Sequence, residues 1–178
     1  MSAGIPLELG PMPASAEMRT VDERMVNAPL SRIFHLAADV ERWPALLPHY
    51  RYVRFVDRRA DGGGVVDMSA NRPFGVVQWP TWWQSRMAVN APGGPRSPSI
   101  RYTHVAGVTR GMEVEWTFEE MAGLTRVRIV HMWDGPSSVP GVGGLAATLV
   151  IGPVFVHGIA SRTLTGLADV AEQARLTG

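Results

Sequence analysis

The amino-acid sequence predicts an α+β fold: seven strands of an antiparallel sheet precede one long C-terminal helix, and two short helices follow the first strand. Three observations support this fold class. Strand-like runs are separated by Gly, Pro or Asn, residues 154–176 have helical periodicity, and two prolines begin short apolar segments early in the chain. The strands are expected at 18–26, 52–57, 64–70, 81–89, 100–105, 112–121 and 124–133.

The first strand is followed by two short helices between Pro29 and Leu47. Pro29 and Pro44 each introduce an apolar stretch, and proline is tolerated at a first helical position because its missing N–H loses no hydrogen bond there. We expect a bent helical pair that closes the mouth of a cavity. The polar, glycine-rich residues 58–63 then predict the turn of a hairpin between the second and third strands.

The last two strands show the clearest alternation. Apolar residues and one histidine occupy every second position, which predicts that one face is buried: Met112, Val114, Trp116, Phe118, Val127, Ile129, His131 and Trp133. On the solvent face, ion pairs of small energetic value are expected between glutamates of one strand and arginines of the other, namely Glu113, Glu115 and Glu119 with Arg126 and Arg128.

Residues 154–176 predict an amphipathic helix about 35 Å long, sufficient to lie across the sheet. Its buried stripe is Val156, Ala160, Leu164, Leu167, Ala171 and Ala174, with Arg162, Asp169 and Glu172 on the other side. Pro153 suits its first turn, and residues 142–151 are expected to form a shorter helix before it.

Composition limits the functional classes. The 178 residues fit one domain, predicted at 18–178 after a flexible N-terminal arm at 1–17 that lacks the features of a secretion signal. The net charge of +1, with scattered basic residues, argues against nucleic-acid binding. No cysteine is present, which fits a reducing compartment, and we expect a cytoplasmic protein. All 17 basic residues are arginine, so Schiff-base chemistry on lysine is excluded.

Two further patterns have weak functional support. Residues 135–161 carry no Asp, Glu or Arg, yet their prolines and glycines break the segment into pieces too short to cross a bilayer, leaving shallow membrane contact as an alternative. Residues 141–146 match the G-x-G-x-x-A phosphate turn, but no strand leads into them and only helix follows, so a pocket-edge loop is the preferred interpretation. The five histidines lack metal-ligand spacing, and no metal or cofactor is predicted.

Several residues resemble those of a known family. The run Val40-Glu41-Arg42-Trp43-Pro44, the following Tyr50 and the later Trp82-Trp83-Gln84-Ser85-Arg86 are similar to the polyketide aromatase/cyclase branch of the START/Bet v 1-like (SRPBCC) superfamily. The resemblance covers about residues 19–175. It implies a helix-grip fold, in which a curved antiparallel sheet wraps around the long C-terminal helix and encloses an apolar cavity.

The orientation of the fourth strand is open. Trp82, Gln84 and Arg86 share one face, while Met87 lies on the other. The pattern alone favours Met87 inside and Arg86 in water. The resemblance implies the reverse, because an arginine at this position of the family strand points into the cavity. Gln84 departs from the family, which commonly has a small hydroxyl residue there.

The resulting candidate site combines both lines of argument. The resemblance implies Arg86 and Tyr50 as catalytic groups that hold a carbonyl oxygen, and the alternation adds His131, which is either a core histidine or a pocket acid or base. The expected ligand-binding residues are Trp43, Trp82, Gln84, His104, Trp116, Phe118 and Trp133. We expect a cavity of about 300–1,000 Å³, enough for a drug-sized molecule.

Three functions remain open at this stage. The first is binding of an apolar or aromatic small molecule with polyketide cyclase or aromatase activity, in which aldol cyclisation is followed by dehydration. The second is a non-enzymatic lipid or quinone carrier, in which Arg86 and Tyr50 orient the polar end of the ligand. The third is an interaction or stress-response module with a vestigial cavity. The fold alone does not distinguish them, and the sequence does not indicate the oligomeric state.

Overall fold

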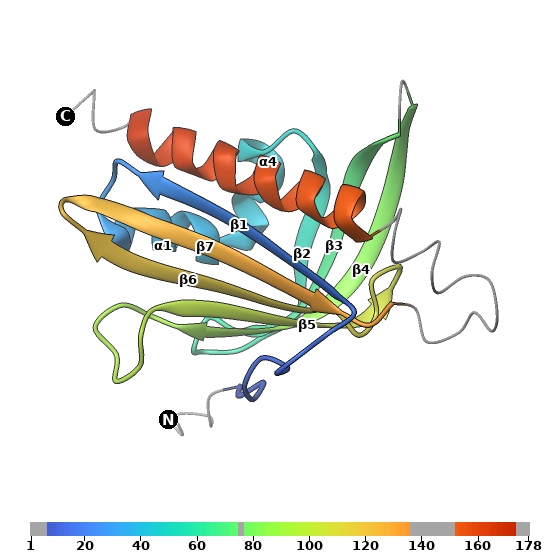
Figure 1. The fold of residues 1–178 in the computed structure, drawn as a ribbon, viewed down its shortest axis with the longest axis horizontal. Helices are drawn as coiled ribbons and strands as arrows, with labels where there is room; N and C mark the ends of the chain where they lie inside the picture. Colours follow the sequence, from blue (N-terminus) through green and yellow to red (C-terminus); the bar gives the residue numbers. More distant parts are fainter. Residues whose placement is uncertain (1–6, 75–76, 136–151, 174–178) are drawn as a thin grey trace.

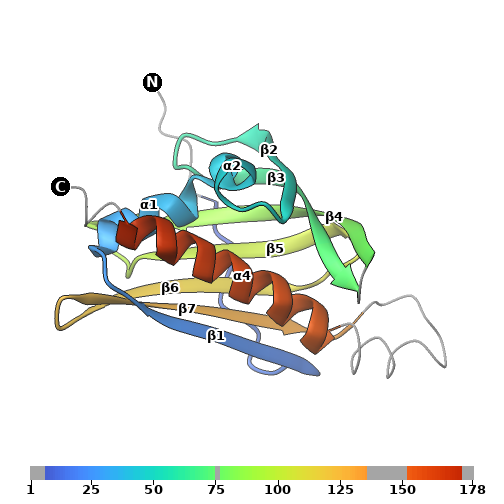
Figure 2. The same cartoon turned by 90° about the horizontal axis from the view of Figure 1, so that it is seen from above.

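The computed structural model describes residues 7–74, 77–135 and 152–173, and the side chains at these positions except 72–74, 77–79 and 152–157. Its strands form one antiparallel sheet in the order β1-β7-β6-β5-β4-β3-β2. The sheet is curved, and helix α4 lies diagonally across its inner face (Figures 1 and 2). This arrangement confirms the predicted fold class.

The predicted order of elements is also confirmed. The strands are β1 (Met18–Val26), β2 (Tyr50–Arg58), β3 (Gly64–Phe74), β4 (Val77–Asn90), β5 (Ser99–Gly107), β6 (Glu113–Met121) and β7 (Leu124–Trp133). The helices are α1 (Leu30–Ala38), the 3-10 turn η1 (Val40–Arg42), α2 (Trp43–Leu46) and α4 (Gly152–Gln173). β3 and β4 are longer than expected, because their ladder continues past Pro73 and Pro80.

The two short helices form where the prolines predict them. Pro29 precedes α1 as its N-cap residue, and Pro44 lies in the first turn of α2. The indole Nε1 of Trp43 donates to the carbonyl oxygen of Leu36 at 3.0 Å, which joins α2 to α1. This bond holds the indole ring of Trp43, which lines the cavity between the sheet and α4.

The alternation is confirmed in β6 and in the first half of β7, whereas Val130 and Met132, on the other face of β7, are also buried. The predicted ion pairs are correct only in part. Arg126 pairs with Glu119, which lies directly opposite in the register of the two strands. Arg128 lies opposite Thr117 on that side and instead approaches Glu23 of β1, with 3.9 Å between nitrogen and oxygen. The pairing of Arg128 is therefore decided by a neighbouring residue of β1, which the sequence of the hairpin alone does not reveal.

Helix α4 packs its predicted stripe against the sheet. Ala160, Leu164, Leu167 and Ala171 are buried, whereas the side chains of residues 156 and 174 lie outside the described part. The predicted short helix at 142–151 and the glycine-rich turn at 141–146 also lie outside the described residues. Within the described ranges, no helix combines the length and apolar character needed to cross a membrane.

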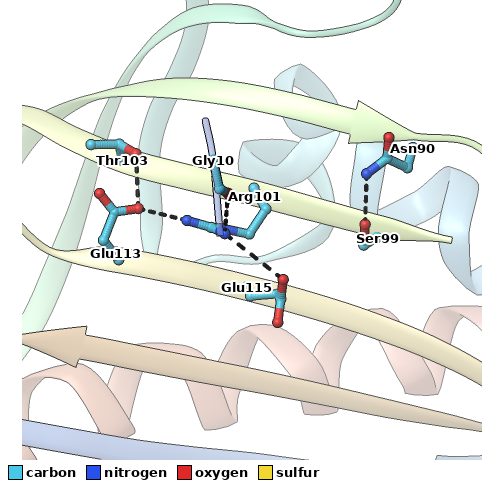
Figure 3. A network of polar contacts seen from close by, with 7 residues as sticks. All are labelled: Gly10, Asn90, Ser99, Arg101, Thr103, Glu113 and Glu115. Carbon is cyan, nitrogen blue, oxygen red and sulfur yellow. Dashed lines mark hydrogen bonds and ion pairs between the residues drawn. The ribbon is translucent and has the colours of Figure 1, made fainter. Parts of the chain in front are cut away.

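The N-terminal residues 7–17, assigned above to a flexible arm, contact the sheet on the face opposite α4. The guanidinium of Arg101 donates to the carbonyl oxygen of Gly10 at 2.9 Å and to Glu113 at 2.9 Å, and it approaches Glu115 at 3.9 Å (Figure 3). Glu113 and Glu115, predicted to pair within their hairpin, therefore pair with β5 instead.

Candidate ligand-binding site

A small cavity lies between the inner face of the sheet and α4. Its volume is about 70 Å³, and its walls come from α2, β2 to β7 and α4. The predicted volume of about 300–1,000 Å³ is therefore wrong for this structure. The reason is that large side chains fill the interior. The space suits a few water molecules or a small group, so a larger ligand requires the side chains to move.

Aromatic rings form much of the cavity wall. The ring centroids of Trp43 and Tyr50 are 5.1 Å apart, and those of Trp43 and Trp116 are 6.0 Å apart. Trp83 lies 6.5 Å from Tyr50 and stacks on His104 at 6.1 Å. The predicted wall residues Trp43, Tyr50, His104 and Trp116 are therefore brought together. Such a wall favours flat, apolar ligands through area burial and ring contacts.

Tyr50 connects the cavity to an outer cleft. Its hydroxyl lies 3.1 Å from the Thr163 hydroxyl of α4, which is also 3.1 Å from the Nε2 atom of His49. His49 lines the outer cleft together with Arg162. Burial, and secondarily the charge of Arg162, lowers the pKa of His49 to about 4. His49 is consequently neutral near pH 7.

Two histidines contribute polar atoms to the cavity wall. His131 of β7 faces inward as predicted, and its Nδ1 lies 3.4 Å from the Thr20 hydroxyl. His104 of β5 lies 2.6 Å from the Thr109 hydroxyl through its Nδ1. An imidazole is the side chain best suited to exchange protons near neutral pH. These two residues are therefore the candidate acids or bases of the site.

Tyr102, which was not among the predicted site residues, also lines the cavity. It is 4% exposed, and its hydroxyl has no hydrogen-bond partner among the residues that the structure describes. Burial, and secondarily Tyr50, raises the pKa of Tyr102 well above its usual value. The hydroxyl therefore stays protonated at neutral pH.

The prediction that Arg86 points into the cavity is wrong. Arg86 and Trp82 are exposed on the face of β4 that points away from α4, whereas Trp83 and Met87 are buried. Gln84 shares the outer face and donates to Asp67 at 2.8 Å. The orientation favoured by the alternation alone is correct. Arg86, Trp82 and Gln84 are thus not part of the cavity wall.

Phe118 and Trp133 are buried but lie outside the cavity wall. The ring of Phe118 packs edge-on against Phe34 of α1, with 5.1 Å between centroids. The indole Nε1 of Trp133 donates to the carbonyl oxygen of Arg110 at 3.0 Å. In this structure both residues contribute to the core.

Two of the residues missed by the prediction, Tyr102 and Trp83, carried usable signals in the alternation of their strands. Tyr102 is two positions from His104 on the same predicted strand, so a wall containing His104 should also contain Tyr102. Trp83 was missed because the resemblance reversed the orientation of β4. Thr163 has no comparable signal, since its contact with Tyr50 depends on how α4 crosses the sheet.

Solved structures with similar folds support this description. The chain matches an aromatase/cyclase, ZhuI, from Streptomyces sp. R1128 with a TM-score of 0.72 and 17% identity, over 88% of this chain and 94% of the other. It matches TTHA0849 from Thermus thermophilus with a TM-score of 0.71 and 21% identity, over 88% and 99%. A START superfamily protein from Mycobacterium smegmatis matches with a TM-score of 0.64 and 15% identity, over 88% and 98%. At these identities the matches show the shared fold.

A family model provides the assignment. Residues 26–152 match the model described as polyketide cyclase / dehydrase and lipid transport. The matched range begins at the end of β1 and includes Trp43, Tyr50 and all of β2 to β7. It spans well over half of the 178 residues. The chain therefore belongs to the polyketide cyclase/dehydrase and lipid transport family.

Proposed function

We propose that this protein binds an apolar or aromatic small molecule in the cavity between the sheet and α4. The observation that supports this most is the convergence of Trp43, Trp83 and Trp116 with several polar groups on one cavity between the sheet and α4. An apolar wall with a few oriented polar atoms is the usual form of a small-molecule site. Met68 and Met112 also line the cavity, and their flexible side chains can shift to admit a ligand larger than the present volume.

Polyketide cyclisation is the more specific form of this proposal. An aldol closure requires removal of a proton beside one carbonyl and delivery of a proton to the oxygen of another, and dehydration then removes water. His131 and His104 on the cavity wall can exchange these protons. Family membership supports this chemistry. The proposed cyclisation does not depend on Arg86.

A lipid or quinone carrier is the second candidate. The described polar side chains of the cavity wall are those of Tyr, His, Thr and Trp, which can orient a ligand without transforming it. The family description includes lipid transport as well as cyclase activity. A cyclase should convert a linear poly-β-ketone into a ring faster than the uncatalysed reaction, whereas a carrier should bind lipids or quinones without turnover.

Tryptophan fluorescence provides a direct test of binding. We expect a planar tricyclic phenol, a long-chain fatty acid or a short-chain quinone to quench the cavity tryptophans and to raise the melting temperature by mass action. Ala160 lines the cavity from α4, so Ala160→Met should fill the space and weaken binding. Gln173→Met, on the exposed side of the same helix, should leave binding unchanged.

Two results would contradict the proposal. One is a wild-type protein whose fluorescence and melting temperature do not respond to saturating amounts of any of the three ligand classes. The other is equal weakening of binding by Ala160→Met and Gln173→Met, which would place the ligand outside the cavity. Turnover of a poly-β-ketone, lost in His131→Gln while binding is kept, would favour the cyclase over the carrier.

A further inference from the structure

The hydroxyl of Tyr102 is a buried polar group for which the described protein supplies no partner. It belongs to a side chain on the cavity wall, and the atom itself is inaccessible to solvent. Buried hydroxyls are nearly always hydrogen-bonded, because removing one from water without a new partner costs free energy. Tyr102 lines a cavity that has to widen to admit a ligand, and a bound molecule that then reaches this hydroxyl would supply the missing partner.

The neighbouring Tyr50 does not serve the same purpose. The Thr163 hydroxyl has one hydrogen, which it donates to the carbonyl oxygen of Ile159 at 2.8 Å. The oxygen of Thr163 then accepts from Tyr50, whose hydroxyl lies 3.1 Å away. The hydrogen of Tyr50 is therefore directed toward α4. The hydrogen of Tyr102 is not committed to any described group.

The protonation state of Tyr102 suits a donor. Burial raises its pKa well above the usual value, with a smaller contribution from Tyr50. The group thus remains a neutral hydroxyl at physiological pH and can donate to an oxygen that carries a partial or full negative charge. A phenolate at this position could only accept.

We propose that Tyr102 determines ligand specificity by donating a hydrogen bond to a carbonyl or hydroxyl oxygen of the bound molecule. The cavity then selects oxygen-bearing ring compounds over hydrocarbons of the same size. This inference rests on the proposed function, because it requires that the cavity binds a ligand. The role applies equally to a substrate that is cyclised and to a ligand that is only carried.

Three bicyclic probes test the assignment: naphthalene, which has no polar group; 1-tetralone, which only accepts; and 2-naphthol, which accepts and donates. Their dissociation constants are measured by tryptophan quenching with wild type, Tyr102→Phe and Tyr52→Phe. Tyr52 is the matched control, because it lies on β2 outside the cavity, beside the guanidinium of Arg54.

In wild type, we expect 1-tetralone and 2-naphthol to bind more tightly than naphthalene. Tyr102→Phe should weaken binding of both oxygen-bearing probes by about 3- to 10-fold, the size expected for one neutral hydrogen bond. It should leave naphthalene binding equal or stronger, and Tyr52→Phe should change none of the three constants. The melting temperature of ligand-free Tyr102→Phe should equal or exceed that of wild type, because the variant removes an unpaired buried hydroxyl.

The possible failures are distinguishable. If wild type binds the probes but Tyr102→Phe keeps the same preference for oxygen, the role of Tyr102 is wrong and the cavity function stands. If Tyr102→Phe weakens 2-naphthol but not 1-tetralone, Tyr102 accepts rather than donates. A marked loss of stability in ligand-free Tyr102→Phe would show that the hydroxyl has a structural partner. If no probe binds wild type, the cavity function itself is contradicted.

Discussion

His49 separates the outer cleft from the hydroxyl network of the cavity. Its Nε2 contacts Thr163 at 3.1 Å, and Arg162 lines the same cleft. Protonating His49 in the folded protein would place a positive charge in a half-buried position near a permanent cation. Burial and Arg162 both oppose this charge, which explains a pKa lowered from 6.5 to about 4.

This lowered pKa makes a prediction for the pH dependence of stability. Between about pH 6.5 and about pH 4, the unfolded chain binds a proton at position 49 that the folded protein does not bind. The free energy of unfolding should therefore fall as the pH decreases through this range. Above about pH 6.5, the full stabilising contribution of neutral His49 should be present. His49→Gln removes the titrating group and should reduce this loss, as measured by denaturant unfolding at a series of pH values.

The control for this experiment is His35→Gln, since His35 is exposed on α1 and bonded to the backbone of its own helix. This variant should keep the wild-type dependence on pH. Parallel curves for wild type and His49→Gln would show that position 49 does not contribute to the acid sensitivity.

Single residues on the wall also show where sequence reasoning succeeds. His131 and Trp116 were placed correctly because a clean alternation fixes their side of the sheet. Arg86 was placed on the wrong side because a short, degenerate motif was preferred to the alternation of β4. An arginine inside would have needed a buried partner, and its exposed position avoids the desolvation cost.

At the scale of the elements, α4 closely approaches Leu47, the C-cap residue of α2, at Gly166. A Cβ atom added to Gly166 would lie 2.3 Å from Cδ2 of Leu47, which is 1% exposed. The absence of a side chain at Gly166 therefore lets the helix approach α2. Three residues earlier on the same helix, Thr163 contacts Tyr50. The close approach of the two helices helps to hold this contact.

Two glycine substitutions in α4 should have opposite effects on stability. A Cβ atom added to Gly158 would have no heavy atom within 4 Å apart from its chain neighbours and its own helix backbone, so Gly158→Ala should raise the free energy of unfolding by up to about 1 kcal/mol through helix propensity. Gly166→Ala gains the same propensity but crowds the confined Leu47, and we expect a net loss of about 1–3 kcal/mol. Denaturant unfolding of both variants measures the difference.

Leu47→Ala provides the check on the mechanism. Leu47→Ala should be destabilising alone. The double variant with Gly166→Ala should lose less stability than the sum of the losses in the two single variants, because the smaller side chain at position 47 removes the crowding. Equal stabilisation by Gly158→Ala and Gly166→Ala would contradict the close packing at position 166.

The elements themselves were predictable because each has one dominant period. β1 and β7 begin and end at the expected residues, and the stripe of α4 is buried where it is described. The volume of the cavity was not predictable in the same way. It depends on how Trp43, Trp83 and Trp116 fill the space between elements, which the period of any one element does not encode.

At the scale of the whole molecule, the two faces of the sheet are covered differently. The inner face packs against α4 and contains the cavity, as Figure 2 shows for the helix and the sheet. Residues 7–17 also reach three connecting segments beyond the strands: the amide of Leu7 donates to Asp61, Glu8 pairs with Arg96, and the amide of Glu17 donates to Asp134. The cavity therefore lies on the inner face, while the described N-terminal segment contributes contacts on the other side.

Arg101 is the central contact of this outer layer. Its side chain is 7% exposed, bonded to Glu113 at 2.9 Å and to the carbonyl oxygen of Gly10 at 2.9 Å (Figure 3). Because the charged group is largely removed from water, its partners matter more than those of an exposed pair. The pair of Arg96 and Glu8, exposed at both side chains, should contribute little.

Removing residues 1–16 should leave the sheet, α4 and the cavity intact, because none of the described residues among them, 7–16, lines the cavity. The deletion exposes Arg101 to water and removes its bond to Gly10, so we expect the free energy of unfolding to fall by about 1–3 kcal/mol. Arg101→Met should cost more in the full chain than in the shortened one, since part of its effect is shared with the segment. Arg96→Met should change stability by less than about 1 kcal/mol in both.

Affinity for a cavity ligand should be unchanged by the deletion. Additive losses from the deletion and Arg101→Met would show that the segment does not act through this arginine, and a weakened ligand affinity would show that the outer layer supports the cavity.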